Sequence, residues 1–417
     1  MATDRRTVIG GALAVTLAGP VAAATPEPVV LRRGISLWPW FSLTREYPAP
    51  RTDYAWPPFQ PDRPVPNAGD LRQLAEAGFD FVRLPIDPGP FAAFAGAQRE
   101  RLFAMLSEAV DLILASRLSL VLNVQANAAT HHYNPDRFYG TATAPLLPAY
   151  RDVVVELARR FGGRAPGRIA LEPVNEPPQA CGAVAWNRVQ AALLGAARKA
   201  APAMTLVATG ACGGMGSGLT ALDPASFAAL APVLFTFHFY EPYLFSHQGA
   251  PWMKDEPIYR ALNDVPWPAR AGTLDATLAA VRARMRADTA TSDADKAAAY
   301  AVTETKMKEY FAADPDRGYL DRNLADIRTW ADLYGVAPRR ILMGEFGALR
   351  SDARYVASRA PDRARYIRDV REAAEAAGFA WAFWNLFDGL GLMYDAHRID
   401  PAIIAALGLT MPGTARR

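Results

Sequence analysis

Residues Ile341-Leu-Met-Gly-Glu-Phe-Gly-Ala348 form an apolar run that leads directly to a carboxylate, Glu345. This is the pattern of a buried strand, and a carboxylate at the end of a buried strand is costly unless it is paired or takes part in chemistry. The stretch Arg168-Ile-Ala-Leu-Glu-Pro-Val-Asn-Glu-Pro177 ends in the same way, at Glu176, with the amide of Asn175 beside it. Because a closed parallel barrel brings the carboxyl ends of its strands to one face, we predict a barrel that places the two carboxylates together.

The rest of the chain alternates apolar runs with helical patterns. Continuous rather than alternating apolar runs indicate strands that are buried on both faces, as in a parallel sheet. The strands are expected at 34–41, 79–85, 118–125, 168–174, 204–208, 233–240, 340–345 and 379–385. Helices are expected at about 67–77, 98–116, 144–161, 184–200, 320–334 and 362–377. Eight such units predict an α/β protein with a single (β/α)8 (TIM) barrel.

Two long connections interrupt this alternation. Residues 45–66 are rich in proline and aromatic residues, which indicates an ordered loop. Residues 241–318 form the largest insertion, after the sixth strand, and their middle part, 274–307, has the composition of helices. We expect these helices to lie beside the cleft as part of one catalytic domain over residues 25–417.

The composition excludes some classes of partner. The chain has 417 residues, of which 51% are hydrophobic and 21% charged, enough to build a large core. The formal net charge of +3 is close to neutral for this length, and no basic run is interleaved with aromatic residues. The charge therefore gives no reason to expect binding to nucleic acid or to an anionic membrane.

The first 24 residues have the pattern of an export signal. Thr3-Asp-Arg-Arg-Thr-Val-Ile9 is a twin-arginine pattern, and the apolar run that follows, residues 8–21, is too short to span a bilayer. We expect cleavage near Ala24 and a periplasmic or secreted protein. The alternative is a cytosolic protein with an apolar N-terminus.

The chain has two cysteines, Cys181 and Cys212. Each follows an expected strand, so both are expected in loops on the same face of the barrel. In an oxidising compartment they could form a disulfide, but the sequence leaves the paired and the free state open. Neither has the spacing of a metal site.

The ends of the expected strands gather polar and aromatic side chains. Two facing carboxylates among aromatic residues are typical of glycoside hydrolysis, in which one carboxyl group protonates the leaving oxygen and the other attacks or activates water. No metal-ligand cluster, phosphate-binding loop or other cofactor motif is present, so no cofactor is expected. The candidate site residues are Trp38, Trp40, Arg83, Gln125, Asn175, Glu176, His238, Tyr240, Glu345 and Trp384.

These residue types indicate distinct roles. Arg83 and Tyr240 could donate hydrogen bonds to Glu345 and keep it ionised. Asn175 could bind a sugar hydroxyl, and the tryptophans, with Trp252 in the insertion, offer flat faces for sugar rings. The structural alternatives are a salt bridge at a strand end for Glu176 and Glu345 and an ion pair inside the barrel for Arg83. Plain packing is the alternative for His238, Tyr240, Trp38, Trp40 and Trp384. Glu172 is expected to pair with an arginine in the barrel interior.

The same residues carry a resemblance to a known family. Arg83 in VRLPID, the NEP motif of Asn175 and Glu176, the GEFG motif of Glu345, and the segment His238-Phe-Tyr240 followed by Trp384 occur in the order of glycoside hydrolase family 5, the cellulase family. The resemblance covers residues 31–390. It implies a retaining endo-type β-glycanase with Glu176 as acid/base and Glu345 as nucleophile, whose carboxyl groups lie about 5–5.5 Å apart.

The chain departs from this resemblance at the third strand. The family commonly ends this strand with an Asp-x-His pattern, and the corresponding residues here are Asn123 and Gln125. Glutamine can bind a hydroxyl but carries no charge, and His131 or His132 could reach the site instead. The departure leaves the carboxylate pair intact and makes the backbone sugar of the substrate an open question.

The leading hypothesis is a monomeric hydrolase that binds a polysaccharide or oligosaccharide of the β-glucan type, cellulose-like or mixed-linkage. The alternatives are a transglycosylase, a hydrolase of a bacterial exopolysaccharide or mannan, and a glycan-binding protein without catalysis. A metal-dependent barrel hydrolase would lose its activity to a chelator.

Overall fold

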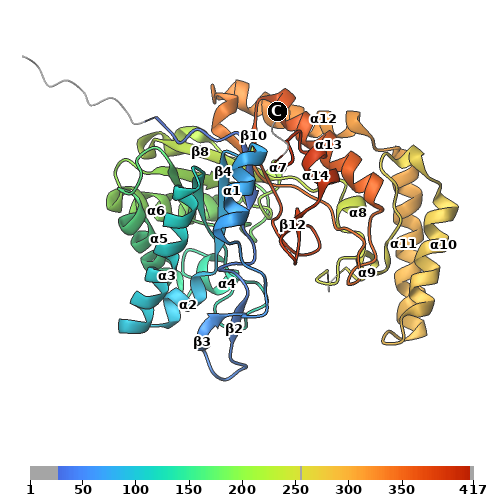
Figure 1. Ribbon diagram of the computed structural model, residues 1–417, viewed down its shortest axis with the longest axis horizontal. Helices are drawn as coiled ribbons and strands as arrows, with labels where there is room; N and C mark the ends of the chain where they lie inside the picture. The colour runs from blue at the N-terminus through green and yellow to red at the C-terminus, as the bar shows by residue number, and fades with distance from the viewer. Residues whose placement is uncertain (1–26, 254–255, 414–417) are drawn as a thin grey trace, which may run out of the picture.

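The computed structural model describes residues 27–253 and 256–413, so the predicted export signal, residues 1–24, lies outside the described residues. Eight parallel strands close into a barrel in the order β1-β10-β9-β8-β7-β6-β5-β4 (Figure 1). The predicted (β/α)8 barrel is therefore confirmed. The strands are β1 Arg33–Ser36, β4 Phe81–Ile86, β5 Ser119–Val124, β6 Ile169–Glu172, β7 Thr205–Thr209, β8 Val233–His238, β9 Ile341–Glu345 and β10 Ala380–Phe383.

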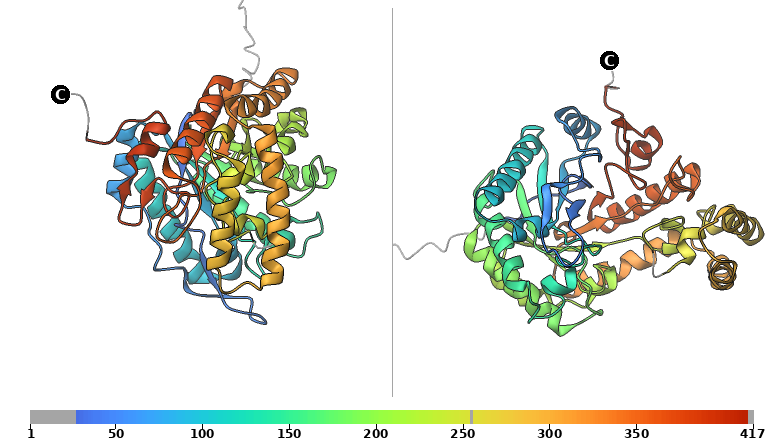
Figure 2. Two further views of the ribbon diagram at one scale, coloured as in Figure 1. Left: turned by 90° about the vertical axis from the view of Figure 1, so that its right-hand side faces the viewer. Right: turned by 90° about the horizontal axis from the view of Figure 1, so that it is seen from below.

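Helices surround the barrel on its outside (Figure 2). The long ones lie close to the predicted ranges: α1 Ala68–Ala77, α3 Gly96–Ala115, α5 Leu147–Phe161, α6 Val184–Ala200, α12 Arg317–Leu333 and α13 Ala360–Ala377. Shorter helices complete the layer: α2 Pro88–Ala93, α4 Pro135–Tyr139, α7 Gly216–Thr220, the 3-10 turn η1 Pro224–Leu230 and α14 Pro401–Ala406. None of the described helices is both long enough and apolar enough to cross a bilayer.

The interior of the barrel changes character along its axis. The half nearer the amino-terminal ends of the strands is a small apolar cluster that includes Phe81, Val121 and Leu342. Val29 and Leu31 from the N-terminal segment join this cluster. The Val29 amide donates to Thr205 Oγ1 at the start of β7, at 2.9 Å, so this segment closes the floor of the barrel. The other half is polar, because the side chains of Arg83 and Glu172 are fully buried there.

The prediction for residues 45–66 was partly wrong. This segment contributes to an antiparallel hairpin of β2 Thr44–Glu46 and β3 Tyr54–Phe59, with an irregular register between the two strands. Two prolines, Pro57 and Pro58, lie inside β3 and hide the strand pattern in the sequence. Proline is tolerated here because β3 pairs on one side only, so its missing donors break no ladder.

Five barrel strands end earlier than predicted, at Ser36, Val124, Glu172, His238 and Phe383. Beyond these points the chain continues into the loops at this end of the barrel.

The insertion after β8 is helical, as predicted. It contains α8 Tyr243–Ser246, α9 Ile258–Ala261, α10 Leu274–Ala287 and α11 Asp293–Ala313. Helices α10 and α11 lie side by side and project away from the barrel, at the right of Figure 1 and in both views of Figure 2. Thr273 and Ser292 cap their N-termini by accepting backbone N–H groups, which fixes where each helix begins.

Strands β8 and β9 fall out of register at their carboxyl ends. Phe237 pairs with Met343, but the next residue, His238, pairs with Glu345, which leaves Gly344 without a partner. A bulge of this kind re-aims the side chain that follows it, and here it sets Glu345 beside His238. A Cβ atom at Gly344 would lie 2.6 Å from Thr236 Oγ1 and 3.2 Å from His238 Nε2, so the bulge requires glycine.

Substitution of Gly344→Ala is expected to lower the free energy of unfolding by about 1–3 kcal/mol, because the added methyl group overpacks the barrel interior. The shift is measured by thermal and urea unfolding. Gly163→Ala is the matched control, since a Cβ atom there meets nothing within 4 Å. A Gly344→Ala protein as stable as the control would contradict this account of the bulge.

Candidate active site

Glu345 lies at the end of β9 with only 5% of its side chain exposed, and it is hydrogen-bonded on both oxygens. Arg83 Nη1 donates to Oε1 at 2.7 Å, and the Tyr240 hydroxyl donates to Oε2 at 2.9 Å. His238 Nδ1 lies 3.6 Å from the same Oε2. Each of these contacts stabilises negative charge on the carboxylate.

Arg83, on β4, donates hydrogen bonds to several polar side chains of the site. Its guanidinium donates twice to Glu172, at 2.8 and 2.9 Å, so Glu172 is the interior partner that the sequence predicted. Its Nη2 also donates to Asn175 Oδ1 at 2.7 Å. Because the oxygen of this amide is occupied, the Asn175 NH2 group is the end that can donate to another molecule. A guanidinium stays protonated in proteins, so the site always holds this cation.

Glu176 follows β6 and is the accessible member of the pair, with 39% of its side chain exposed. Its Oε1 lies 2.8 Å from His238 Nδ1. One carboxylate oxygen from Glu176, one from Glu345 and a ring nitrogen of His238 all lie within 4.8 Å of one another. The structure thus brings together the two predicted carboxylates, with the imidazole between them.

The charges in this group are coupled. Burial raises the pKa of Glu345, and so does the negative charge of Glu176. The positive charges of His238 and Arg83 lower it, but the resulting pKa of Glu345 is above its ordinary value. Burial also raises the pKa of Glu176, but the hydrogen bond and charge of His238 outweigh it and lower the net pKa. Burial lowers the pKa of His238, yet the two carboxylates raise it overall. These directions favour a protonated imidazole on His238 beside an ionised Glu176.

Aromatic rings border the carboxylates on two sides. Trp38 and Trp384 are partly exposed, and their ring centres lie 6.2 Å apart. Trp40, also a predicted site residue, packs against Phe41 and the main core. Trp381, three residues before Trp384, is fully buried in the core.

A second aromatic line, on the insertion side, was largely missed by the sequence analysis. Tyr240 contacts His247, with ring centres 5.0 Å apart, and His247 contacts Trp252 at 6.3 Å. Tyr243 stacks on the same imidazole at 4.7 Å. Burial lowers the pKa of His247 to about 4, so this ring is neutral. A search of the loop after the sixth strand, rather than of the strand end alone, would have found these residues.

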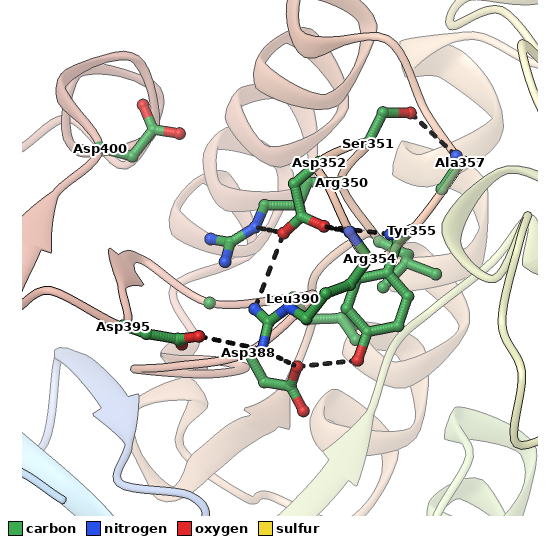
Figure 3. A network of polar contacts seen from close by, with 12 residues as sticks. Arg350, Ser351, Asp352, Arg354, Tyr355, Ala357, Asp388, Leu390, Asp395 and Asp400 are labelled. Carbon is green, nitrogen blue, oxygen red and sulfur yellow. Dashed lines mark hydrogen bonds and ion pairs between the residues drawn. The ribbon is translucent and has the colours of Figure 1, made fainter. Parts of the chain in front are cut away.

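A polar network joins the loops after β9 and β10 (Figure 3). The Tyr355 hydroxyl donates to Asp388 Oδ1 at 2.8 Å, which ties the loop after β9 to the loop after β10. Arg354 lies between Asp388 and Asp395, at 3.5 and 3.0 Å. Tyr355 and Trp384 pack against the same small apolar cluster as Tyr240. The network therefore restrains the loops that carry Tyr355 and Trp384.

The third strand end presents uncharged amides. Gln125 Oε1 is a buried atom without a hydrogen-bond partner among the described residues, and so are both amide atoms of Asn123. His131 does not take their place in the hydrogen bonding. Its ring bonds Glu46 Oε2 at 2.9 Å and the Arg51 carbonyl oxygen at 2.8 Å, and thus fastens the β2–β3 hairpin.

Cys181 and Cys212 are joined in a disulfide, with their Cα atoms 4.6 Å apart. The bond links the loop that carries Glu176 to the loop after β7.

Comparison with known proteins places the chain among the cellulases. It is 23% identical over 355 residues to endoglucanase 3 of Fibrobacter succinogenes, covering 82% of this chain and 49% of that protein. It is 29% identical over 192 residues to cellodextrinase A of Ruminococcus flavefaciens, covering 45% of this chain and 54% of that protein. The chain thus spans about half the length of the curated relatives it matches.

Solved structures share the fold. Thermotoga maritima Cel5A in complex with cellobiose has a TM-score of 0.64 and 19% identity, over 91% of this chain and 97% of that one. The cellulose synthase subunit Z of Clostridioides difficile has a TM-score of 0.63 and 20% identity, over 90% and 99%. The family model of the cellulases matches residues 52–389, which contain both carboxylates and their hydrogen-bond partners, and the chain therefore belongs to glycosyl hydrolase family 5.

Proposed function

We propose that the protein is a retaining endo-β-glucanase that hydrolyses a cellulose-like or mixed-linkage β-glucan by double displacement. The observation that carries the proposal is the spacing of the carboxylates, with oxygens of Glu176 and Glu345 within 4.8 Å. Retaining enzymes hold their carboxyl groups about 5–5.5 Å apart, whereas inverting enzymes leave about 6.5–9.5 Å for a water molecule. The names of the matched relatives, two of which are an endoglucanase and a cellodextrinase, support the same substrate class.

In the first step, Glu345 attacks the anomeric carbon while Glu176 protonates the leaving oxygen. In this proposal the proton comes from the Glu176–His238 hydrogen bond, whose two heavy atoms lie 2.8 Å apart. Binding of the sugar excludes water and brings the leaving oxygen to Glu176, so the proton moves from the imidazole to the carboxyl group. The glycosidic bond breaks and a glycosyl ester forms on Glu345.

In the second step, Glu176 accepts a proton from water, the water oxygen attacks the same carbon, and the ester bond to Glu345 breaks. Arg83 and Tyr240 stabilise the departing carboxylate through the hydrogen bonds that they make to Glu345. These donors are already aligned, so no reorganisation is needed as the charge returns.

Neighbouring side chains supply sugar contacts in this proposal. The Asn175 NH2 group donates to a hydroxyl, and Gln125 Oε1 accepts from one. Trp38 and Trp384 on one side, and Trp252 on the other, stack on sugar rings. Since Gln125 is neutral where related enzymes commonly have histidine, mannan or a bacterial exopolysaccharide is the second candidate substrate.

We also propose that the enzyme acts as a monomer in the periplasm or outside the cell, on the basis of the twin-arginine pattern in residues 1–24. The N-terminal sequence of the protein recovered after export tests this, with cleavage near Ala24 as the expected result. Size-exclusion chromatography with light scattering tests the monomer.

The pH dependence follows from the protonation of Glu345 and of the Glu176–His238 pair. Catalysis needs Glu345 ionised, so kcat/KM is expected to fall as the pH drops through the pKa of this group, which is raised above about 4.5. It also needs one proton on the Glu176–His238 pair, so kcat/KM should fall again as the pH rises through the pKa of His238, which is raised above about 6.5. The profile should therefore be bell-shaped, with its maximum between these limits. A rate that still rises above about pH 8 would contradict the proton assignment.

The proposed function is tested by measuring new reducing ends on carboxymethyl cellulose, mixed-linkage β-glucan, β-1,3-glucan and mannan, with Glu345→Gln as the blank. Release from the cellulose or mixed-linkage substrates is expected, and mannan hydrolysis alone would favour the second candidate. Products longer than the substrate would indicate transglycosylation. Binding without release by the wild-type protein would show a glycan-binding protein instead.

A further inference from the structure

The glycine-rich loop after β7 lies beside Glu176 and His238. A Cβ atom built on Gly214 would be 3.5 Å from Glu176 Cγ and 3.7 Å from the Nδ1 atom of His238, so Gly214 leaves no spare room beside these two side chains. The backbone N–H of His238 donates to the Gly214 carbonyl at 2.8 Å, which ties the loop to β8.

This loop has an unusual backbone. Three consecutive residues, Cys212, Gly213 and Gly214, have positive φ angles of 67°, 62° and 74°. The left-handed region is disfavoured for a residue with a Cβ atom, so Cys212 needs external restraint to stay there.

Three restraints on Cys212 and Gly213 come from the segment that carries Glu176. The Cys212 N–H donates to the Gln179 carbonyl at 2.8 Å, and the Gly213 N–H donates to the Pro177 carbonyl at 2.9 Å. The disulfide joins Cys212 to Cys181 of the same segment. The loop and the segment therefore form one cross-linked unit with Glu176 at its edge.

We propose that Cys181 and Cys212 are positioning residues for the acid/base step, because their disulfide holds the loop whose Gly214 lies beside Glu176 and His238 and so keeps Glu176 aligned with the leaving oxygen. This inference rests on the proposed function. It concerns mainly the acid/base half of the mechanism, since Glu345 accepts its two hydrogen bonds from Arg83 and Tyr240, neither of which belongs to the cross-linked unit. Opening the disulfide is therefore expected to impair protonation of the leaving group and to spare nucleophilic attack.

The test compares two substrates with the same sugar and different leaving groups. Dinitrophenyl β-cellobioside releases a phenolate that needs no proton, whereas cellotetraose must be protonated by Glu176. For the double variant Cys181→Ala/Cys212→Ala, kcat/KM on cellotetraose should fall about 10-fold or more, within the range that acid catalysis contributes, and change less than about twofold on the aryl glycoside. Dithiothreitol, which becomes its cyclic disulfide as it reduces the Cys181–Cys212 bond to two thiols, should reproduce this pattern in the wild type only.

Glycine variants keep the test decisive if the cysteine variant does not fold. Gly213→Ala strains the loop and leaves the disulfide in place, so it should also lose activity selectively on cellotetraose. Gly167→Ala is its matched control, since Gly167 has φ 74°, open space around it, and a position before β6, at the end of the barrel away from Glu176. The Gly167→Ala substitution should not lower kcat/KM for one substrate more than for the other.

The inference would be overturned if the double variant, the reduced wild type and Gly213→Ala lost activity equally on both substrates, or lost none on either. The proposed function would then remain intact. An oxidised wild-type protein that cleaves neither substrate would overturn the proposed function and the inference with it.

Discussion

Glu345→Gln is expected to abolish glucan hydrolysis, with kcat reduced on the order of 10⁴-fold or more, because an amide cannot form the glycosyl ester. The fold should be little changed. Glutamine keeps an oxygen that can accept from Arg83 Nη1, and it removes a buried carboxylate whose pKa is already raised. Initial rates on the best soluble glucan measure the loss, and thermal unfolding checks the fold.

The matched control for this variant is Glu241→Gln. Glu241 directly follows Tyr240, and burial raises the pKa of its carboxyl group too. Its Oε2 accepts from the Tyr240 backbone N–H at 2.9 Å, so it shapes the loop. The control should keep activity within a few-fold of the wild type. If Glu345→Gln kept its turnover of glucan, the double-displacement mechanism proposed here would be wrong.

Glu176→Ala is expected to slow hydrolysis of cello-oligosaccharides by about 10²- to 10⁴-fold, the usual contribution of general acid–base catalysis. The first step on dinitrophenyl β-cellobioside should persist, because its leaving group needs no proton. The second step should become rate-limiting, since no carboxylate activates the water.

Added azide distinguishes this assignment from a general loss of the fold. The truncated side chain leaves space beside the glycosyl ester, and azide attacks without a general base. It should accelerate turnover of the aryl glycoside and give a β-glycosyl azide, identified by NMR. The absence of both the acceleration and the azide product would show that Glu176 is not the acid/base.

The barrel and its carboxylate pair were predictable because both depend on local patterns combined with one topological rule. The apolar run before Glu345 and the run before Glu176 each identify a strand end. Parallel closure then places every such end on one face. The contact between Arg83 and Glu345, which are 262 positions apart, follows from that rule.

Most of the features that were missed lie in loops, whose sequences have no periodicity. The β2–β3 hairpin contains prolines, and its cross-link through Glu46 to His131 joins two segments 85 positions apart that no topological rule brings together. The aromatic line through His247 lies beyond the strand end where the search stopped. The bulge at Gly344 changes the register by one residue, which a strand pattern does not reveal.

The closed floor of the barrel has a practical consequence for how the enzyme can be handled. Val29 and Leu31 plug the end of the barrel that lies opposite the carboxylates, so the described chain enters the fold on the far side from the cleft. A flexible linker joined ahead of Glu27 would leave from that side. A protein coupled to a bead or a fibre through such a linker should present the carboxylate end of its barrel to the surrounding solution and keep access to polymers too large to diffuse beneath it.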